Sequence, residues 1–230
     1  MKIKKILGLS MAAVMAVSVL ASMPASAKTS VSYSPISKTY KSDGMDMLKL
    51  SIKTPKLGGS SVGVKKINAY FKKSAKKTVK EAKKMLVAAK EQYKSTPKFF
   101  NSYMLKSSAK LVYAKKGKYS FKVSSMSYSG GAHGGSYLGG ITFDKSGKKL
   151  PLSKMTKYAP ADLKNKIVKA TNKKIDKNPD LFFPEAKNTV LKKSLNKFDA
   201  FLKDNYLYVV YQEYELAPYA AGKTIVKVKI

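Results

Sequence analysis

The sequence has no cysteine, no arginine and a single histidine, His133, among its 230 residues. Without cysteine, no disulfide can form and no lipid can be attached through a thiol, so packing alone must stabilise the fold. Catalytic zinc sites need several histidine, cysteine or carboxylate ligands close together, and one histidine does not supply them. We therefore expect no bound metal and no cofactor.

Acidic residues are also scarce, since 13 of them stand against 46 basic residues, all of which are lysine. The resulting net charge of +33 attracts anionic polymers and makes the folded protein repel itself. Lysine is a hydrated point charge, whereas arginine offers a planar fork for detailed recognition. We expect a diffuse partner, namely anionic cell-wall polymers or a membrane surface. We expect no specific nucleic acid, because base recognition relies on arginine, asparagine and glutamine.

The first 27 residues have the three parts of a secretory signal. Three lysines at the start precede an apolar stretch at 6–20, and small residues at 25–27 form a cleavage pattern. The apolar stretch is shorter than the roughly 20 residues that a membrane-spanning helix needs. We predict that residues 1–27 are a signal peptide and that the protein is secreted, extracellular or associated with a bacterial cell envelope.

Residues 64–93 form the clearest predicted element. Apolar residues recur every three or four positions, as in one amphipathic helix of roughly 45 Å: Val64, Ile67, Phe71, Ala75, Val79, Ala82, Leu86, Ala89 and Tyr93. The opposite face carries seven lysines, Lys72, Lys73, Lys76, Lys77, Lys80, Lys83 and Lys84. Like charges four residues apart destabilise an isolated helix by about 0.2–0.5 kcal/mol per pair, so the apolar face requires a sheet beneath it. The lysine face is either a solvated surface or a docking stripe for a polyanion.

Shorter patterns predict the remaining elements. Apolar alternation and turn residues predict strands at 45–53, 99–114, 118–128, 137–143, 206–211 and 224–230. Helical spacing predicts a second helix at 161–175. The stretch 190–202 is ambiguous, and we divide it into a short helix followed by a strand from about Phe198.

Two small groups are candidates for specific chemistry. Four glycines at 130–135 surround His133, so backbone N–H groups and one imidazole could bind a ligand. The same glycines could serve only to supply unusual backbone angles. Glu213 and Glu215 stand two apart on a predicted strand and would share one face. Paired carboxylates can hydrolyse glycosides, although a solvated strand edge explains them equally well.

Three stretches, taken together, resemble a known family. They are YSGGAHG at 128–134 with TFD and SGK at 142–148, NPDLFFP at 178–184, and YELAPYAAG at 214–222. Their order and spacing are similar to those of the RsiV-like extracellular domains of lysozyme-sensing anti-sigma factors. The same module stands N-terminal to the catalytic domain in PdaC-type peptidoglycan deacetylases. The resemblance covers roughly 45–230.

This resemblance implies an α+β fold, in which an antiparallel β-sheet packs against a long amphipathic helix and a second helix. It implies a PdaC-N-terminal-like subdomain at 28–125 and an RsiV C-terminal-like subdomain at 126–230. It also implies envelope-facing recognition rather than catalysis, because the deacetylase chemistry belongs to a separate domain. The candidate ligand-binding residues are Gly131, His133, Gly134, Glu215 and Tyr219.

We expect a secreted, non-catalytic module that binds anionic cell-wall polymers through its lysine face. The alternative is a protein-binding module that recognises lysozyme or another wall hydrolase. Common lysozymes are basic, so like-charge repulsion opposes that alternative unless an acidic patch such as Glu213 and Glu215 meets the partner. A hydrolase that uses His133 is the third hypothesis.

Overall fold

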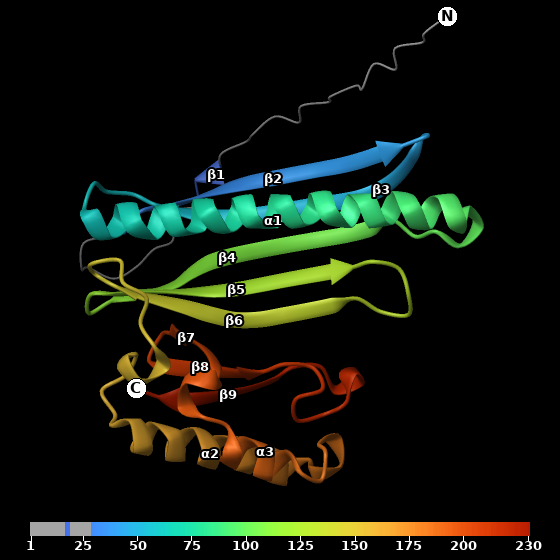
Figure 1. Ribbon diagram of the computed structural model, residues 1–230. Helices are drawn as coiled ribbons and strands as arrows, with labels where there is room; N and C mark the ends of the chain where they lie inside the picture. Colours follow the sequence, from blue (N-terminus) through green and yellow to red (C-terminus); the bar gives the residue numbers. More distant parts are fainter. Residues whose placement is uncertain (1–16, 19–28) are drawn as a thin grey trace, which may run out of the picture.

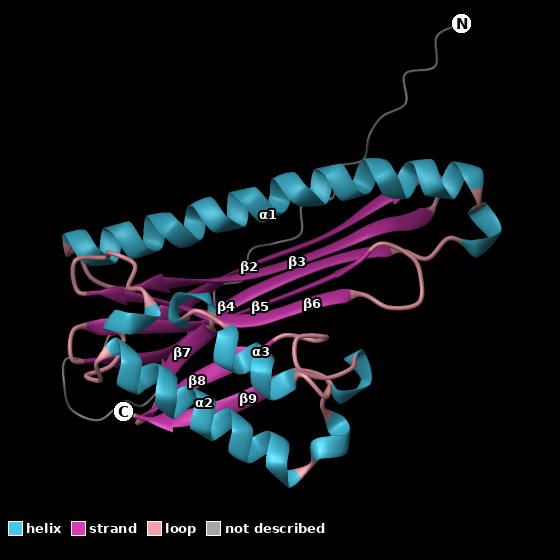
Figure 2. Ribbon diagram, turned by 60° about the horizontal axis from the view of Figure 1, so that its bottom comes forward, coloured by secondary structure: helices cyan, strands magenta, loops and turns pink. Residues whose placement is uncertain are grey.

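The computed structural model describes residues 17–18 and 29–230, and it has the expected α+β fold, arranged in four layers (Figures 1 and 2). A long helix covers one face of a six-stranded sheet, a three-stranded sheet lies on the other side, and two shorter helices cover that second sheet. The predicted signal peptide lies outside the described residues except for Val17 and Ser18. In the part of the chain that is described, no helix is both long and apolar enough to cross a membrane.

The larger sheet is mixed. Its strands lie side by side in chain order: β1 (Val17–Ser18), β2 (Val31–Ser42), β3 (Met45–Leu57), β4 (Tyr103–Lys115), β5 (Lys118–Tyr128) and β6 (Gly135–Asp144). All neighbours are antiparallel except β3 and β4, which are parallel. The predicted antiparallel pairing is confirmed for the other neighbours. Strands β3 and β4 are the exception, because the connecting helix returns the chain to the end of the sheet where β3 began.

That helix is α1 (Val62–Ser95), and it confirms the predicted amphipathic element. The Ser61 hydroxyl caps it by accepting a hydrogen bond from the Val64 N–H at 3.3 Å. Its first half packs Phe71 against Phe121 of β5, with ring centroids 4.6 Å apart. Its second half packs small side chains, among them Ala82, on β3 and β4. Burial of this face keeps α1 on the sheet despite its charge.

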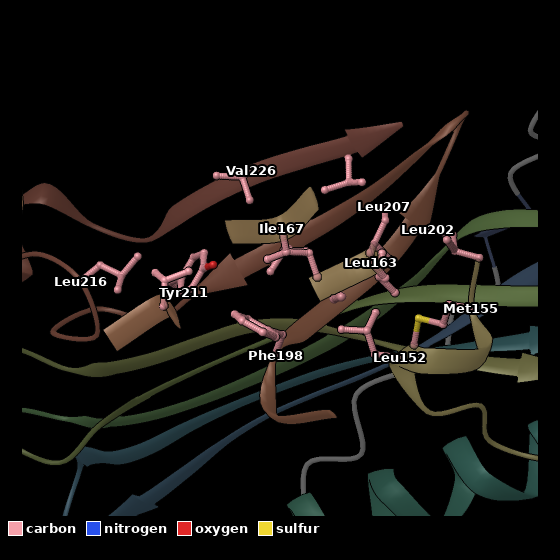
Figure 3. Close-up of a cluster of buried hydrophobic side chains, with 14 of the residues drawn as sticks. Leu152, Met155, Leu163, Ile167, Phe198, Leu202, Leu207, Tyr211, Leu216 and Val226 are labelled. Atoms are coloured by element: carbon pink, nitrogen blue, oxygen red, sulfur yellow. The ribbon is translucent and has the colours of Figure 1, made fainter. Parts of the chain in front are cut away.

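The second sheet consists of β7 (Asp199–Lys203), β8 (Tyr206–Tyr211) and β9 (Thr224–Lys229). Figure 3 shows the apolar core between this sheet and α2 (Pro160–Lys177), with Ile167 close to the centre. Helix α3 (Ala186–Lys192) begins before the predicted start at residue 190 and ends soon after it. The helical spacing continues beyond α3 in the sequence, but Leu195–Lys197 form a 3₁₀ turn and the chain then enters β7. The predicted strand from about Phe198 is therefore confirmed.

The two sheets approach closely at Gly140 of β6. A Cβ atom there would lie 2.3 Å from the carbonyl oxygen of Ala200, so only glycine fits. Nearby, the Leu202 N–H donates a hydrogen bond of 2.9 Å to the buried hydroxyl of Ser120. The larger sheet continues to Asp144, whereas the expected subdomain boundary lay after residue 125. Strand β6 therefore belongs to the N-terminal layers.

Candidate functional site

The loop between β5 and β6 meets the connection between β8 and β9 at one end of the molecule. The ring of His133 stacks on the ring of Tyr219, with centroids 4.2 Å apart, and the ring of Tyr214 lies 5.7 Å from that of Tyr219. We call these three side chains the aromatic cluster. All three are exposed, and Tyr214 shows 58% of its surface to solvent. The structure thus brings His133 and Tyr219, both predicted site residues, into contact.

Glycines shape the loop that carries His133. Gly130 and Gly131 have positive φ angles of 81° and 97°. A Cβ atom on Gly134 would lie 2.5 Å from the carbonyl oxygen of Ser127. The Tyr219 hydroxyl donates to the Gly134 carbonyl at 3.4 Å. The predicted residues Gly131 and Gly134 therefore have conformational roles in positioning the histidine.

Tyr214 has an unusual backbone conformation. Its φ angle is 63°, which lies in the left-handed region that costs a residue other than glycine about 1–2 kcal/mol. Its side chain is largely exposed, so little burial compensates for this strain. The surrounding residues therefore impose a strained conformation that presents an aromatic ring to solvent.

An ion pair fixes one side of this connection. The Glu213 carboxylate accepts hydrogen bonds from the Lys223 ammonium group and, at 2.6 Å, from the Ser136 hydroxyl. Only 16% of the glutamate side chain and 12% of the lysine side chain are exposed. Burial by itself would raise the pKa of Glu213, but the hydrogen bonds from Lys223 and Ser136 outweigh it and lower that pKa. Glu213 thus holds the β8–β9 connection against β6.

Glu215 is a second fixed carboxylate, and its predicted relation to Glu213 is wrong. Strand β8 ends at Tyr211, so the two glutamates lie in a turn and do not share a strand face. The Glu215 carboxylate pairs with Lys193, which follows α3, and accepts a hydrogen bond of 2.9 Å from the Gln212 N–H. The Glu215 side chain is therefore engaged in contacts within the fold and does not line the aromatic cluster with His133.

A third contact joins the two sheets beside the cluster. The Tyr137 hydroxyl donates to Asp199 at 2.6 Å, and the Gln212 amide donates to the other oxygen of Asp199 at 2.8 Å. Burial, together with the Asp199 carboxylate, raises the pKa of Tyr137. Asp199, Gln212 and Lys223 could not be recognised from the sequence, because their partners lie on distant segments and no local pattern marks them.

The contacts of His133 offer no activated nucleophile. Its Nδ1 atom lies 3.3 Å from the carbonyl oxygen of Gly134, and its ring face contacts Tyr219. Within residues 17–18 and 29–230, no hydrogen bond joins His133 to a carboxylate or hydroxyl group. Over the same residues, no three histidine, cysteine, aspartate or glutamate side chains are placed to hold a metal ion.

The predicted lysine face belongs to α1, the helix that forms an outer layer of the molecule on the far side of the larger sheet from β7–β9 (Figure 2). All seven predicted lysines are exposed: Lys72, Lys73, Lys76, Lys77, Lys80, Lys83 and Lys84. Five ion pairs occur among the described residues, and none of them uses a lysine of α1. We call this surface the lysine face.

Two family profiles match the chain. Residues 42–136 match the family described as deacetylase PdaC. Residues 152–230 match a protein family of unknown function, DUF3298. Together, the two profiles match a PdaC-like/DUF3298 module. The resemblance seen in the sequence is confirmed at this level.

Solved structures show the same fold as the module. A DUF3298 family member from Bacteroides fragilis superimposes with a TM-score of 0.63 at 15% identity, covering 94% of this chain and 90% of that one. A DUF3298 family protein from Pseudomonas aeruginosa gives a TM-score of 0.54 at 18% identity, covering 86% and 89%. A search of curated proteins found no match.

The lysine face and the aromatic cluster differ in how they lie on the two family matches. The lysine face and His133 lie in the PdaC-like part, whereas Tyr214 and Tyr219 lie in the DUF3298 part. The aromatic cluster is therefore assembled where the two parts of the module meet.

Proposed function

We propose that this protein is a secreted, non-catalytic module of the bacterial envelope that binds anionic cell-wall polymers. The observation that carries the proposal is the lysine face, where seven exposed lysines lie on one helix without an acidic partner among the described residues. All of these lysines except Lys83 lie four residues from another lysine of the face and repel it. A bound polyanion would therefore remove a repulsion that destabilises the free protein.

The shape of this surface suits a linear polymer. The seven lysines occupy residues 72–84 of α1, which corresponds to roughly 18 Å of helix. Ammonium groups spread over that length can contact successive negative charges without a fixed geometry. A polymer with regularly spaced phosphates or carboxylates, such as a teichoic acid, matches this requirement.

Binding to purified cell walls across salt concentrations tests the proposal. Because exposed charges are screened beyond about 8–10 Å at physiological salt, affinity should fall by roughly tenfold or more between 50 and 200 mM salt. Changing the seven lysines of the lysine face to glutamine should remove most of the binding. Walls stripped of teichoic acid should bind the unchanged protein weakly.

A matched variant separates this surface from net charge alone. It changes seven exposed lysines outside α1 that make no ion pair or side-chain hydrogen bond among the described residues: Lys154, Lys157, Lys169, Lys173, Lys177, Lys192 and Lys197. This variant should keep most of the wall binding. Equal losses of wall binding in the two seven-lysine variants, or wall binding that does not depend on salt concentration, would contradict the proposal.

The aromatic cluster supports a second candidate, a protein-binding module that recognises lysozyme or another wall hydrolase. Exposed tyrosines held in a fixed conformation are typical anchors of protein interfaces. The glutamates that could have offset repulsion from a basic lysozyme, Glu213 and Glu215, are already paired with lysines. A lysozyme titration at physiological salt tests this candidate, which requires a stoichiometric complex that weakens in Tyr214→Ala and Tyr219→Ala.

A further inference from the structure

A groove of 560 Å³ lies between α1 and the β2–β3 hairpin. It exists because the apolar face of α1 packs on β3 and β4, while residues 34–39 in the middle of β2 stay exposed among the described residues. Ile36 of β2 lies opposite the buried residue Ile52 of β3, yet it remains 39% exposed. The open space therefore lies over an apolar side chain that remains partly exposed.

The floor and the far wall of the groove are apolar. Ile36 and Pro55 contribute from the strands, and Ala69, Ala75 and Val79 contribute from α1. Because Ala69 and Ala75 have small side chains, this side of the helix leaves space beside Ile36. A volume of this size falls in the range of small-molecule sites.

The rim of the groove is cationic. Lys56 of β3 and Lys72 and Lys76 of α1 line it, and all three are exposed. None of the three forms an ion pair with another described residue. Ser34 and Thr54 add hydroxyl groups, and Thr54 donates only a long hydrogen bond of 3.4 Å to the Ser34 carbonyl. The groove thus combines an apolar floor with uncompensated positive charge at its edge.

We infer that this groove binds a single-chain anionic amphiphile of the fatty-acid type. The acyl chain would lie over Ile36 and along Ala75 and Val79, and the carboxylate would face the ammonium groups of Lys72 and Lys76. Charge complementarity selects this occupant, because a neutral apolar ligand leaves the lysines unpaired and a cationic one is repelled. This site goes beyond polymer binding, which requires only the outward charge of α1.

Calorimetric titration with octanoate, decanoate and dodecanoate below their micelle concentrations tests the inference. Affinity should rise by about fourfold for each methylene that enters the groove. Decanol should bind more weakly than decanoate, and decyltrimethylammonium should not bind. Affinity that does not depend on chain length, or equal binding of all three decyl compounds, would overturn the inference.

Variants locate the site. Ile36→Glu and Ala69→Phe change exposed positions on opposite walls, and each should abolish decanoate binding while circular dichroism shows an intact fold. The double variant Lys72→Gln/Lys76→Gln should weaken decanoate by roughly three- to tenfold. The matched double variant Lys83→Gln/Lys84→Gln lies on the same helix outside the groove and should leave decanoate affinity unchanged.

The same variants distinguish this inference from polymer binding. Ile36→Glu should keep salt-sensitive wall binding, because the lysine face is intact. Decanoate binding that survives both Ile36→Glu and Ala69→Phe, or that weakens equally in the two lysine double variants, would show general adsorption and overturn the groove assignment.

Discussion

The lysines of α1 and the two lysines beside the β8–β9 connection have the same side chain but opposite environments. Helix α1 carries eleven lysines and two glutamates, and its lysine face is exposed and unpaired among the described residues. Lys193 and Lys223 are mostly buried, and each holds a glutamate of the connection. The first group remains available to a partner, whereas the second group is committed to the fold.

This difference follows from the number of acidic residues in each part of the chain. Residues 28–144 contain 24 lysines and 5 acidic residues, whereas residues 145–230 contain 19 lysines and 8 acidic residues. The C-terminal layers can therefore pair part of their charge internally. The N-terminal layers must rely on apolar burial to hold a helix that repels itself.

The largest expected effect tests how α1 is held. Phe71→Ala should lower the free energy of unfolding by about 3–5 kcal/mol, because the ring is buried against Phe121 and Phe143 and the change leaves a cavity. Urea denaturation measures this loss. Val87→Ala, at a position of α1 that is 57% exposed, is the control and should cost much less. Similar losses in both variants would mean that α1 does not depend on its aromatic contacts.

A smaller effect tests the paired lysines. Glu213→Gln should lower the free energy of unfolding at pH 7 by about 1–3 kcal/mol, since it leaves Lys223 without its carboxylate partner. Because folding lowers the pKa of Glu213 below its ordinary value of 4.5, its stabilisation is present above that pH and is lost as the pH falls through the lower folded-state value.

The pH dependence supplies the check. Unfolding free energies measured between about pH 7 and pH 3 should converge for the parent and Glu213→Gln at the acidic end. Glu185→Gln, at an exposed position, serves as the control and should follow the parent throughout. A constant gap between the parent and Glu213→Gln down to pH 3 would argue against the ion pair as the cause.

The smallest effect has the opposite sign and tests the unpaired lysines. Lys80→Gln removes the repulsion with Lys76 and Lys84, so it should raise the free energy of unfolding by about 0.4–1 kcal/mol at low salt. The gain should disappear near 1 M salt, where the charges are screened. Lys197→Gln, at an exposed position outside the long helices, should change stability less. A gain that persists at high salt would point to helix propensity instead of repulsion.

Much of the local structure could be predicted. The bounds of β5 and β8 agree with the predicted strands, because turn residues mark their ends and apolar residues fill them. Helix α1 was found because a helical period maintained over thirty residues has no alternative explanation. The candidate site was harder to predict from the sequence. His133 and Tyr219 were both predicted, but their stacking joins positions 86 residues apart and depends on how the sheets pack.

The charge, the amphipathic long helix, the positions of most strands and the glycine loop around His133 follow from the amino-acid sequence, since each depends on residues that are neighbours in the chain. The parallel pairing of β3 with β4, the contacts of Glu213 and Glu215 with different lysines, and the exposure of Ile36 beside α1 arise only when the chain folds. These features depend on which distant segments come into contact, and local periodicity carries no information about that choice.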